Sequence, residues 1–211
     1  YDDIKDLDMS SGEWYVLART RHMLDNIEDE IRERGWYFEN RFKSMPEKDA
    51  AQAAADWEAT RNGQPLNYKQ VERIYSYMSS KTVDKNFLKG MAKESFYNLK
   101  DMGIKTKSVW YEAFDELNFR TKNYIRSMRR NGENLKDKPR IKLSTIHSVK
   151  GGEEDNVVLL TDLTTNTNRS YRKNPDDETR LFYVGATRTK ENLHIVRPKD
   201  EEKSYPMEDY E

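Results

Sequence analysis

Two stretches of this sequence each join an apolar run to a polar turn that carries Lys, Arg, Glu or His. The first, Ile141 to Asp162, reads IKLSTIHSVKGGEEDNVVLLTD, and the second, Asn174 to Arg197, reads NPDDETRLFYVGATRTKENLHIVR. Sheets of the α/β class that handle nucleotides place their ligand-binding groups at strand ends in this way. Because a planar Arg side chain fits the oxygens of a phosphate, the pattern favours the recognition of phosphate groups.

The apolar runs predict the strands that must position these turns. Short apolar runs between polar turns are typical of strands buried in a parallel sheet. Arg19 follows the first run, at the strand end where open sheets bind their ligands. Asn174 and Pro175 predict the start of a helix, with acids in its first turn. The predicted strands are Trp14 to Ala18, Trp36 to Phe38, Ile141 to Thr145, Asn156 to Thr161 and Leu193 to Val196.

The middle of the chain predicts helices instead of strands. Helical patterns cover residues 50–59, 68–78, 87–99 and 110–125. We therefore expect a helical insertion at 46–134 within one sheet domain, formed by 13–45 and 135–200. Residues 1–12 are expected to be a linker, 164–173 a polar loop and 201–211 an acidic tail. The aromatic residues of the insertion either stack on bases or form its core, and helical spacing favours the core; they include Trp57, Tyr75, Tyr77, Phe96, Tyr97, Trp110 and Phe114.

Composition argues against a disulfide-bonded protein, a zinc site and a membrane-spanning protein, and it leaves DNA open as a partner. The chain has no Cys and only three His, so it has no disulfide, and a zinc site is not expected. No apolar run approaches the roughly 18 residues of a membrane span and no signal peptide opens the chain, so we expect a soluble, intracellular protein. From Arg120 to Lys150, ten Lys or Arg stand against two acids. This basic block fits either a polyanion such as DNA or a solvated helix face.

The chain lacks one element that ATP hydrolysis needs. No Gly is followed by Lys, so the sequence contains no G-x-x-x-x-G-K-[ST] phosphate loop. Val157 to Asp162 imitates the acidic strand that accompanies such loops, but Leu163 follows where Glu would be expected. Asp162 is therefore interpreted as an ordinary strand-end residue.

The two stretches resemble signature motifs of the superfamily 1 DNA helicases of the UvrD/Rep/RecB type. Thr145 to Glu153 resembles motif V (T-L-H-x-x-K-G-L-E) and Glu178 to Thr189 resembles motif VI (E-R-R-L-x-Y-V-x-x-T-R-A). Val16 to Arg21 resembles motif IV. The resemblance implies an α/β fold, a RecA-like P-loop-NTPase-type parallel sheet flanked by helices, with the insertion as a reduced accessory domain. It also implies the C-terminal lobe of a helicase, excised or a separate subunit, whose N-terminal lobe holds the phosphate loop.

The resemblance implies roles for individual residues. Arg188 would be the motif VI arginine finger and Arg19 the motif IV arginine, both on ATP, although either alone could be a surface Arg paired with a carboxylate. Glu153, or Glu154 beside it, would accept hydrogen bonds from the ribose of the nucleotide. Gly151 and Gly152 would let the nucleotide approach, although relatives have a bulkier apolar residue at the second position. The single-strand contacts would be Thr145, His147 and Lys150, with His147 alternatively a hydrogen-bond partner that holds the loop.

The implied cofactor is ATP, with Mg²⁺ bound by the N-terminal lobe, and the implied partners are single-stranded DNA and that lobe. The resemblance also implies a role in DNA repair or replication and a bacterial or phage origin. The protein would then lie in the cytoplasm, near the nucleoid. Two other functions stay open: a single-stranded nucleic-acid-binding module without motor activity, and the helicase part of a recombination helicase-nuclease.

Overall fold

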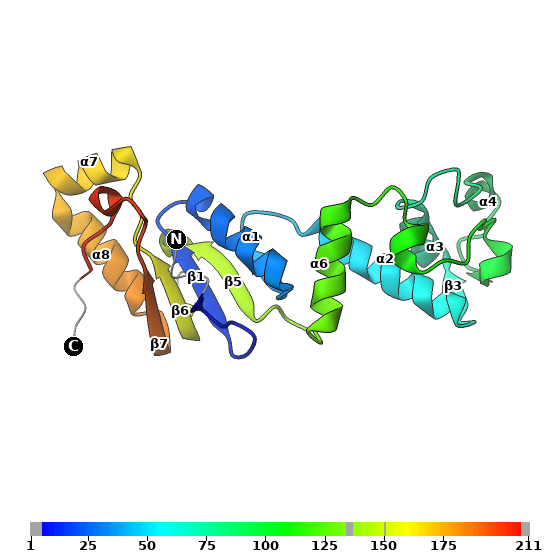
Figure 1. The fold of residues 1–211 in the computed structure, drawn as a ribbon, viewed down its shortest axis with the longest axis horizontal. Helices are drawn as coiled ribbons and strands as arrows, with labels where there is room; N and C mark the ends of the chain where they lie inside the picture. The colour runs from blue at the N-terminus through cyan, green and yellow to red at the C-terminus, as the bar shows by residue number, and fades with distance from the viewer. Residues whose placement is uncertain (1–5, 134–136, 150, 208–211) are drawn as a thin grey trace. The chain divides into compact units, whose positions relative to one another are not determined.

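The computed structural model describes residues 6–133, 137–149 and 151–207. It divides the chain into two compact units (Figure 1). Unit 1 consists of Tyr1–Ser44 and Ser127–Glu211, and unit 2 of Met45–Arg126. Unit 2 ends within helix α6 (Phe119–Arg130), whose residues 127–130 belong to unit 1. The expected bounds of the insertion, 46–134, stay a prediction.

A five-stranded parallel sheet forms the centre of unit 1 and confirms the predicted α/β class. Its strand order is β2-β5-β1-β6-β7, so every pair of neighbours is parallel and most connections cross over the sheet. Central strands β1 and β5 have the predicted bounds. The strands are β1 (Trp14–Ala18), β2 (Phe38–Asn40), β5 (Ile141–Thr145), β6 (Glu154–Leu160) and β7 (Thr189–Val196).

Helices cover both faces of this sheet. Successive strand residues point to opposite faces, and buried Leu17 of β1 packs in one core cluster with Phe182 of helix α8 (Pro175–Ala186). On the opposite face, Asn40 of β2 donates a hydrogen bond of 2.8 Å to Glu28 of helix α1 (Asp25–Arg34). Helices therefore cover the sheet on both faces, as is usual for parallel sheets.

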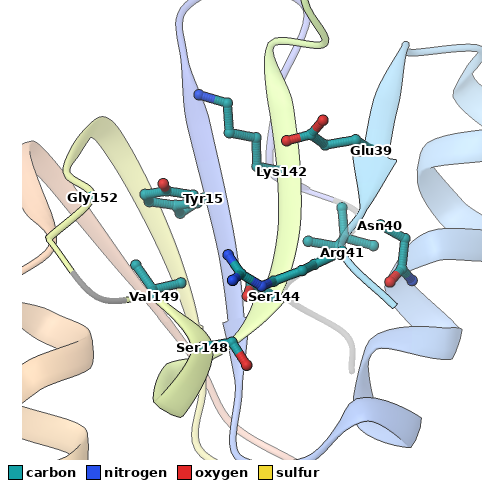
Figure 2. Close-up of a pocket in the computed structure, with 10 residues that line it drawn as sticks. Tyr15, Glu39, Asn40, Arg41, Lys142, Ser144, Ser148, Val149 and Gly152 are labelled. Atoms are coloured by element: carbon teal, nitrogen blue, oxygen red, sulfur yellow. The ribbon is translucent and has the colours of Figure 1, made fainter. Parts of the chain in front are cut away.

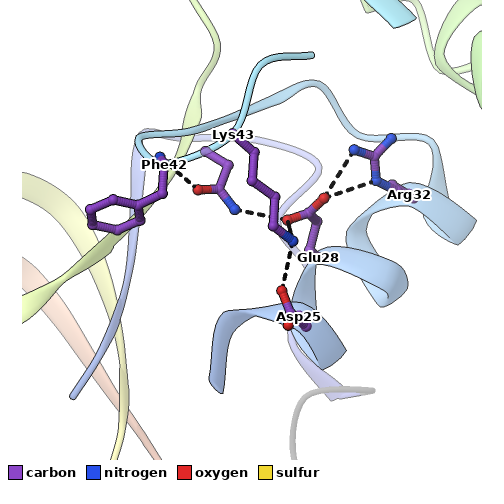
Figure 3. A network of polar contacts seen from close by, with 6 residues as sticks. Asp25, Glu28, Arg32, Phe42 and Lys43 are labelled. Carbon is purple, nitrogen blue, oxygen red and sulfur yellow. Dashed lines mark hydrogen bonds and ion pairs between the residues drawn. The ribbon is translucent and has the colours of Figure 1, made fainter. Parts of the chain in front are cut away.

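Glu28 is a buried carboxylate that ties α1 to β2 and the turn after it (Figure 3). Arg32 donates to one of its oxygens at 3.0 Å, and Asn40 and Lys43 donate to the other at 2.8 and 3.1 Å. Burial alone would raise the pKa of Glu28, but these hydrogen bonds outweigh that effect and lower it. The helix ends at Gly35, whose φ of 72° is the left-handed conformation expected of a glycine cap.

The predicted polar loop at 164–173 is wrong. Thr165–Lys173 forms helix α7, which the Thr164 side chain caps by accepting from the amide of Thr167 at 3.0 Å. None of the α7 residues is buried. The segment lacks the apolar periodicity by which a helix is predicted from sequence, so it was expected to be a loop. The remaining short helices of unit 1 are the 3-10 helices Arg21–Leu24, Ile146–Ser148 and Glu201–Lys203.

Unit 2 is mostly helical, but the helix predicted at 87–99 is wrong. A single turn, α4 (Asn86–Lys89), ends at Gly90, and β4 (Phe96–Tyr97) then pairs antiparallel with β3 (Leu66–Asn67). Trp57, Tyr75, Trp110 and Phe114 are buried, which matches the core interpretation, whereas Phe96 is 69% exposed. The other elements of unit 2 are α2 (Pro46–Arg61), α3 (Tyr68–Tyr75), the 3-10 helix Leu99–Asp101, α5 (Trp110–Ala113) and the first part of α6. Among the described residues, no helix combines the length and apolar character that crossing a membrane requires.

Candidate functional site

The motif residues of unit 1 lie at two opposite edges of the sheet. Because all strands are parallel, β1 and β5 end at one edge, which we call the carboxyl edge; Ala18 is paired with Thr145 there. Strands β6 and β7 begin at the other edge, which we call the amino edge, where the amide of Glu154 donates to the carbonyl of Arg188 at 3.1 Å. Arg19 therefore leaves the sheet at the carboxyl edge and Arg188 enters it at the amino edge.

Arg188 is held at the amino edge without a carboxylate partner in the described chain. Its Nε donates to the carbonyl of Val184 at 3.0 Å, and its Nη2 to the hydroxyl of Thr187 at 3.2 Å. Its Nη1 approaches the carbonyl of Gly152 at 3.4 Å. Neutral acceptors thus fix the direction of the guanidinium while its positive charge stays uncompensated. An arginine in this state suits an incoming anion.

The two adjacent acids of motif V have different surroundings. Glu154 is buried at the start of β6, and its carboxylate accepts from the Lys142 ammonium at 2.5 Å. Desolvation lowers the pKa of Lys142, but the bond to Glu154 outweighs this and raises it. Glu153 is exposed and makes no ion pair within the described residues. Of the two acids, Glu153 is therefore the one available to a ligand.

The two glycines that precede these acids, Gly151 and Gly152, are favoured at their positions for different structural reasons. Gly151 has a φ of 72°, and an added Cβ would meet no atom within 4 Å. Gly152 lies against Tyr15 of β1, whose hydroxyl oxygen would be 2.4 Å from an added Cβ (Figure 2). Tyr15 therefore occupies the volume that a side chain at position 152 would need. This contact packs the motif V loop against the sheet.

Beside this loop lies a cavity of about 280 Å³ on the sheet face, and Figure 2 shows the side chains that line it. Tyr15, Lys142 and Gly152 line it toward the amino edge, and Ser144 and Ser148 toward the carboxyl edge. The motif V loop thus borders both edges.

At the carboxyl edge, Arg19 is engaged in a buried ion pair. Its Nε and Nη2 donate to the two carboxylate oxygens of Glu178 at 2.7 and 2.8 Å. The Glu178 side chain is 6% exposed, and Arg19 supplies its counter-charge. Of the two interpretations weighed for Arg19, the carboxylate-paired one describes the structure.

Thr145 and His147 lie at the same edge, in the turn that follows β5. The hydroxyl of Thr145 donates to the Ser148 hydroxyl at 3.0 Å. The His147 side chain is exposed. Desolvation and the Arg19 cation lower the pKa of His147, and Glu178 acts in the opposite direction. The imidazole is therefore neutral at physiological pH, and one ring nitrogen can still donate to a phosphate oxygen.

The structure does not bring Arg19 and Arg188 together. Strand β6 spans seven residues between the two edges. At about 3.3 Å per residue, the edges are roughly 20 Å apart. Their guanidiniums bind different residues of helix α8, Arg19 at Glu178 and Arg188 at Val184, which are about 9 Å apart along the helix axis. That Arg19 acts on ATP together with Arg188 stays a prediction.

Comparison with known protein families agrees with the motif pattern. The family model described as the UvrD-like helicase C-terminal domain matches residues 19–199. The chain belongs to this family. No curated protein sequence matches it. The parallel sheet and the family match together identify the chain as the C-terminal lobe of a UvrD-type helicase.

Within this helicase lobe, the expected basic block is only partly available to a ligand. Arg140 binds Glu133 at 2.7 Å, and Lys142 is paired with Glu154. Lys150, expected to contact DNA, lies outside the described residues. No group of three or more His, Asp or Glu side chains in the described part of the lobe is placed to hold a metal ion.

Three functional neighbours were missed by sequence reasoning. Glu178 stands first in the helicase motif VI, but nothing in its position indicates that it meets Arg19, which is 159 residues away. Tyr15 and Lys142 occupy neighbouring positions on β1 and β5, in register. Their polar side chains interrupt apolar strands, and this alternation was the only signal available for them.

Proposed function

We propose that this lobe is half of an ATP-driven motor on single-stranded DNA, with the ATP site completed by an N-terminal lobe. The observation that supports this function best is the division of the motif residues between two edges of one sheet. Residues suited to a nucleotide are at the amino edge, and residues suited to a phosphate backbone are at the carboxyl edge. A motor needs both sites on one rigid body, so that a change at one can be transmitted to the other.

At the amino edge, Arg188 acts as the arginine finger. Phosphoryl transfer develops negative charge on the transferred group, and an Arg aimed at that group stabilises it. Arg188 fits this role because its guanidinium is oriented by neutral acceptors and lacks a carboxylate partner in the described chain. Glu153 accepts from the ribose hydroxyls, while Gly151 provides the open backbone beside it. The Mg²⁺ that accompanies ATP is held by the N-terminal lobe.

At the carboxyl edge, Thr145 and His147 contact the DNA backbone, beside the Arg19–Glu178 ion pair. A hydroxyl and an imidazole both donate to phosphate oxygens without reading base sequence. Arg19 and His147 interact electrostatically at this edge, while Arg188 is at the opposite edge. DNA binding is therefore expected to be independent of sequence and sensitive to salt.

The test compares this chain alone with an enzyme in which an N-terminal ATP-binding lobe is present. ATP turnover and oligonucleotide binding are measured for each. We expect the chain alone to bind single strands weakly and to hydrolyse no ATP, and the two-lobed enzyme to show turnover stimulated by DNA. Turnover by the chain alone would overturn the division of labour. A two-lobed enzyme that binds DNA but never hydrolyses ATP would favour a non-motor binding module.

A further inference from the structure

Unit 2 contains a second concentration of positive charge, outside the motifs. The segment from Lys81 to Lys107 has seven Lys against the acids Asp84, Glu94 and Asp101, a net charge of +4. The whole chain has a net charge of −1, so the rest of it carries −5. All seven lysines are exposed. Such a local excess in an acidic chain attracts a polyanion to this segment.

Three of these lysines surround one concave site, which we call the lysine pocket. It has a volume of about 330 Å³ and is lined by Leu99, Lys100, Ile104, Lys105, Thr106 and Lys107. The Lys105 ammonium donates to the carbonyl of Ser80 at 2.7 Å. Lys100 and Lys107 form no ion pair within the described residues. The pocket therefore combines an apolar floor with cations that lack counter-charges.

The backbone fixes this pocket in place. Ile104 forms an antiparallel bridge with Val83, and the amide of Lys105 donates to the carbonyl of Thr82 at 2.9 Å. The amide of Asp84 donates to the carbonyl of Gly103, also at 2.9 Å. Backbone hydrogen bonds thus hold residues 103–105, at the centre of the lysine pocket, against residues 82–84, which limits the entropy lost when a ligand binds.

An exposed aromatic ring stands close to the pocket along the chain. Phe96 is 69% exposed and lies on β4, which is paired with β3. It precedes Leu99 by three residues, so their backbones are at most about 10 Å apart. Three Phe side chains of unit 2 are exposed, Phe87, Phe96 and Phe119, and Phe96 is the one of them that lies on a strand. A ring of this kind offers a surface on which an unpaired base can stack.

We propose that the lysine pocket and Phe96 form a second binding site for single-stranded DNA on the insertion. Lys100, Lys105 and Lys107 bind backbone phosphates, the apolar floor of Leu99 and Ile104 contacts a nucleotide, and Phe96 stacks on a base. Single strands fit this site better than duplex because their bases are exposed to the floor and the ring. The choice of DNA as the polyanion rests on the proposed function.

The experiment measures binding of labelled oligothymidylate to the whole chain at several salt concentrations. We compare wild type with Lys100→Gln/Lys107→Gln, which leaves the Lys105 bond to Ser80 intact. The matched control is Lys48→Gln/Lys69→Gln, which removes the same charge from exposed positions of unit 2 outside the pocket. Loss of two phosphate contacts should reduce the slope of log K against log salt by about 1.4, at about 0.7 per contact. The control should keep the wild-type slope.

Phe96→Ala tests the stacking component separately. It should weaken single-strand binding about tenfold with little change in salt slope, because stacking is not ionic. Phe119→Ala is the control, since Phe119 is 77% exposed in the same unit but lies outside the lysine-rich segment.

Chemical acetylation of lysines with and without DNA gives a readout that needs no variant. DNA should protect Lys100 and Lys107 from acetylation more than it protects Lys48.

Three outcomes would overturn the site: equal salt slopes for pocket and control variants, absence of protection, or tighter binding of duplex than of single strand. An acidic polypeptide that protects the pocket lysines when DNA does not would show that the partner is a protein. The proposed function is tested by a separate measurement, Arg188-dependent ATP turnover in the two-lobed enzyme. Failure of the lysine pocket as a site can therefore be told apart from failure of the proposed function. Pocket variants should retain that turnover at saturating DNA.

Discussion

The guanidinium of Arg19 and the carboxylate of Glu178 form a two-bond ion pair, at 2.7 and 2.8 Å, between the end of β1 and the first turn of α8. Helix α8 ends at Ala186, and Arg188 follows it at the opposite edge of the sheet. One helix therefore has a contact to the proposed DNA edge at its start and the proposed arginine finger beyond its end. This makes α8 the element through which the two edges can influence each other.

Our first prediction concerns this ion pair. In the two-lobed enzyme, Glu178→Gln should reduce the stimulation of ATP turnover by DNA, because α8 then loses its charged link to Arg19. Removal of one partner from a buried pair also costs about 3 kcal/mol of folding free energy, so the melting temperature should fall. The measurements are turnover with and without DNA, and thermal melting. An Arg19→Gln/Glu178→Gln double-mutant cycle then isolates the interaction between the two residues.

The control for this prediction is Asp176→Asn. Asp176 is an exposed acid in the same first turn of α8, and its removal should cost only the helix-dipole contribution, about 0.3–1 kcal/mol. If Glu178→Gln lowers the melting temperature but leaves the stimulation by DNA intact, the ion pair is structural and α8 does not couple the edges.

Much of the sheet was predictable because its strands are local apolar runs. The bounds of β1 and β5 were predicted from sequence, and the motif spacing identified Arg188 and Glu153 as candidates. The edge on which each candidate lies was not predictable, because it depends on strand order and parallel register. Helix α7 was missed for a different reason: its residues are all polar or exposed, so the capping bond of Thr164 marks it better than any apolar pattern.

The second prediction concerns Gly152 and Tyr15. Gly152→Ala should destabilise the lobe by about 1–3 kcal/mol, since its Cβ would lie 2.4 Å from the Tyr15 hydroxyl. Tyr15→Phe removes that oxygen, so the double variant should recover part of the loss. Thermal or urea unfolding of both single variants and the double variant measures the interaction free energy.

Gly151→Ala provides the matched control. An added Cβ there meets no atom, but the φ of 72° makes alanine unfavourable, by about 1 kcal/mol. This loss should not be recovered by Tyr15→Phe. Equal recovery of both glycine variants would show that Tyr15 acts on the loop in some way other than direct contact.

The third prediction is a pH dependence of DNA binding. The free-state pKa of His147 is lowered below its ordinary value of 6.5, mainly by desolvation. A bound phosphate favours the charged imidazole and raises that pKa, so DNA affinity should increase as pH falls through the interval between the two values. Oligonucleotide binding between about pH 5 and 8 should show this increase in wild type and a smaller one in His147→Asn. If the two pH profiles coincide, His147 holds the loop and does not contact DNA.

The last prediction concerns Arg188 in the two-lobed enzyme. If Arg188 meets the γ-phosphate mainly as charge develops there, Arg188→Ala should lower kcat by about 10³-fold or more and change nucleotide affinity much less. Arg188→Lys should not restore turnover, because an ammonium lacks the planar fork of the guanidinium. Single-strand binding without nucleotide should persist in both variants, since Thr145 and His147 lie at the other edge of the sheet. The measurements are kcat, nucleotide Kd and DNA Kd for wild type and both variants. Near-normal turnover in Arg188→Ala would show that its bonds to Val184 and Gly152 only hold the end of α8 against the motif V loop.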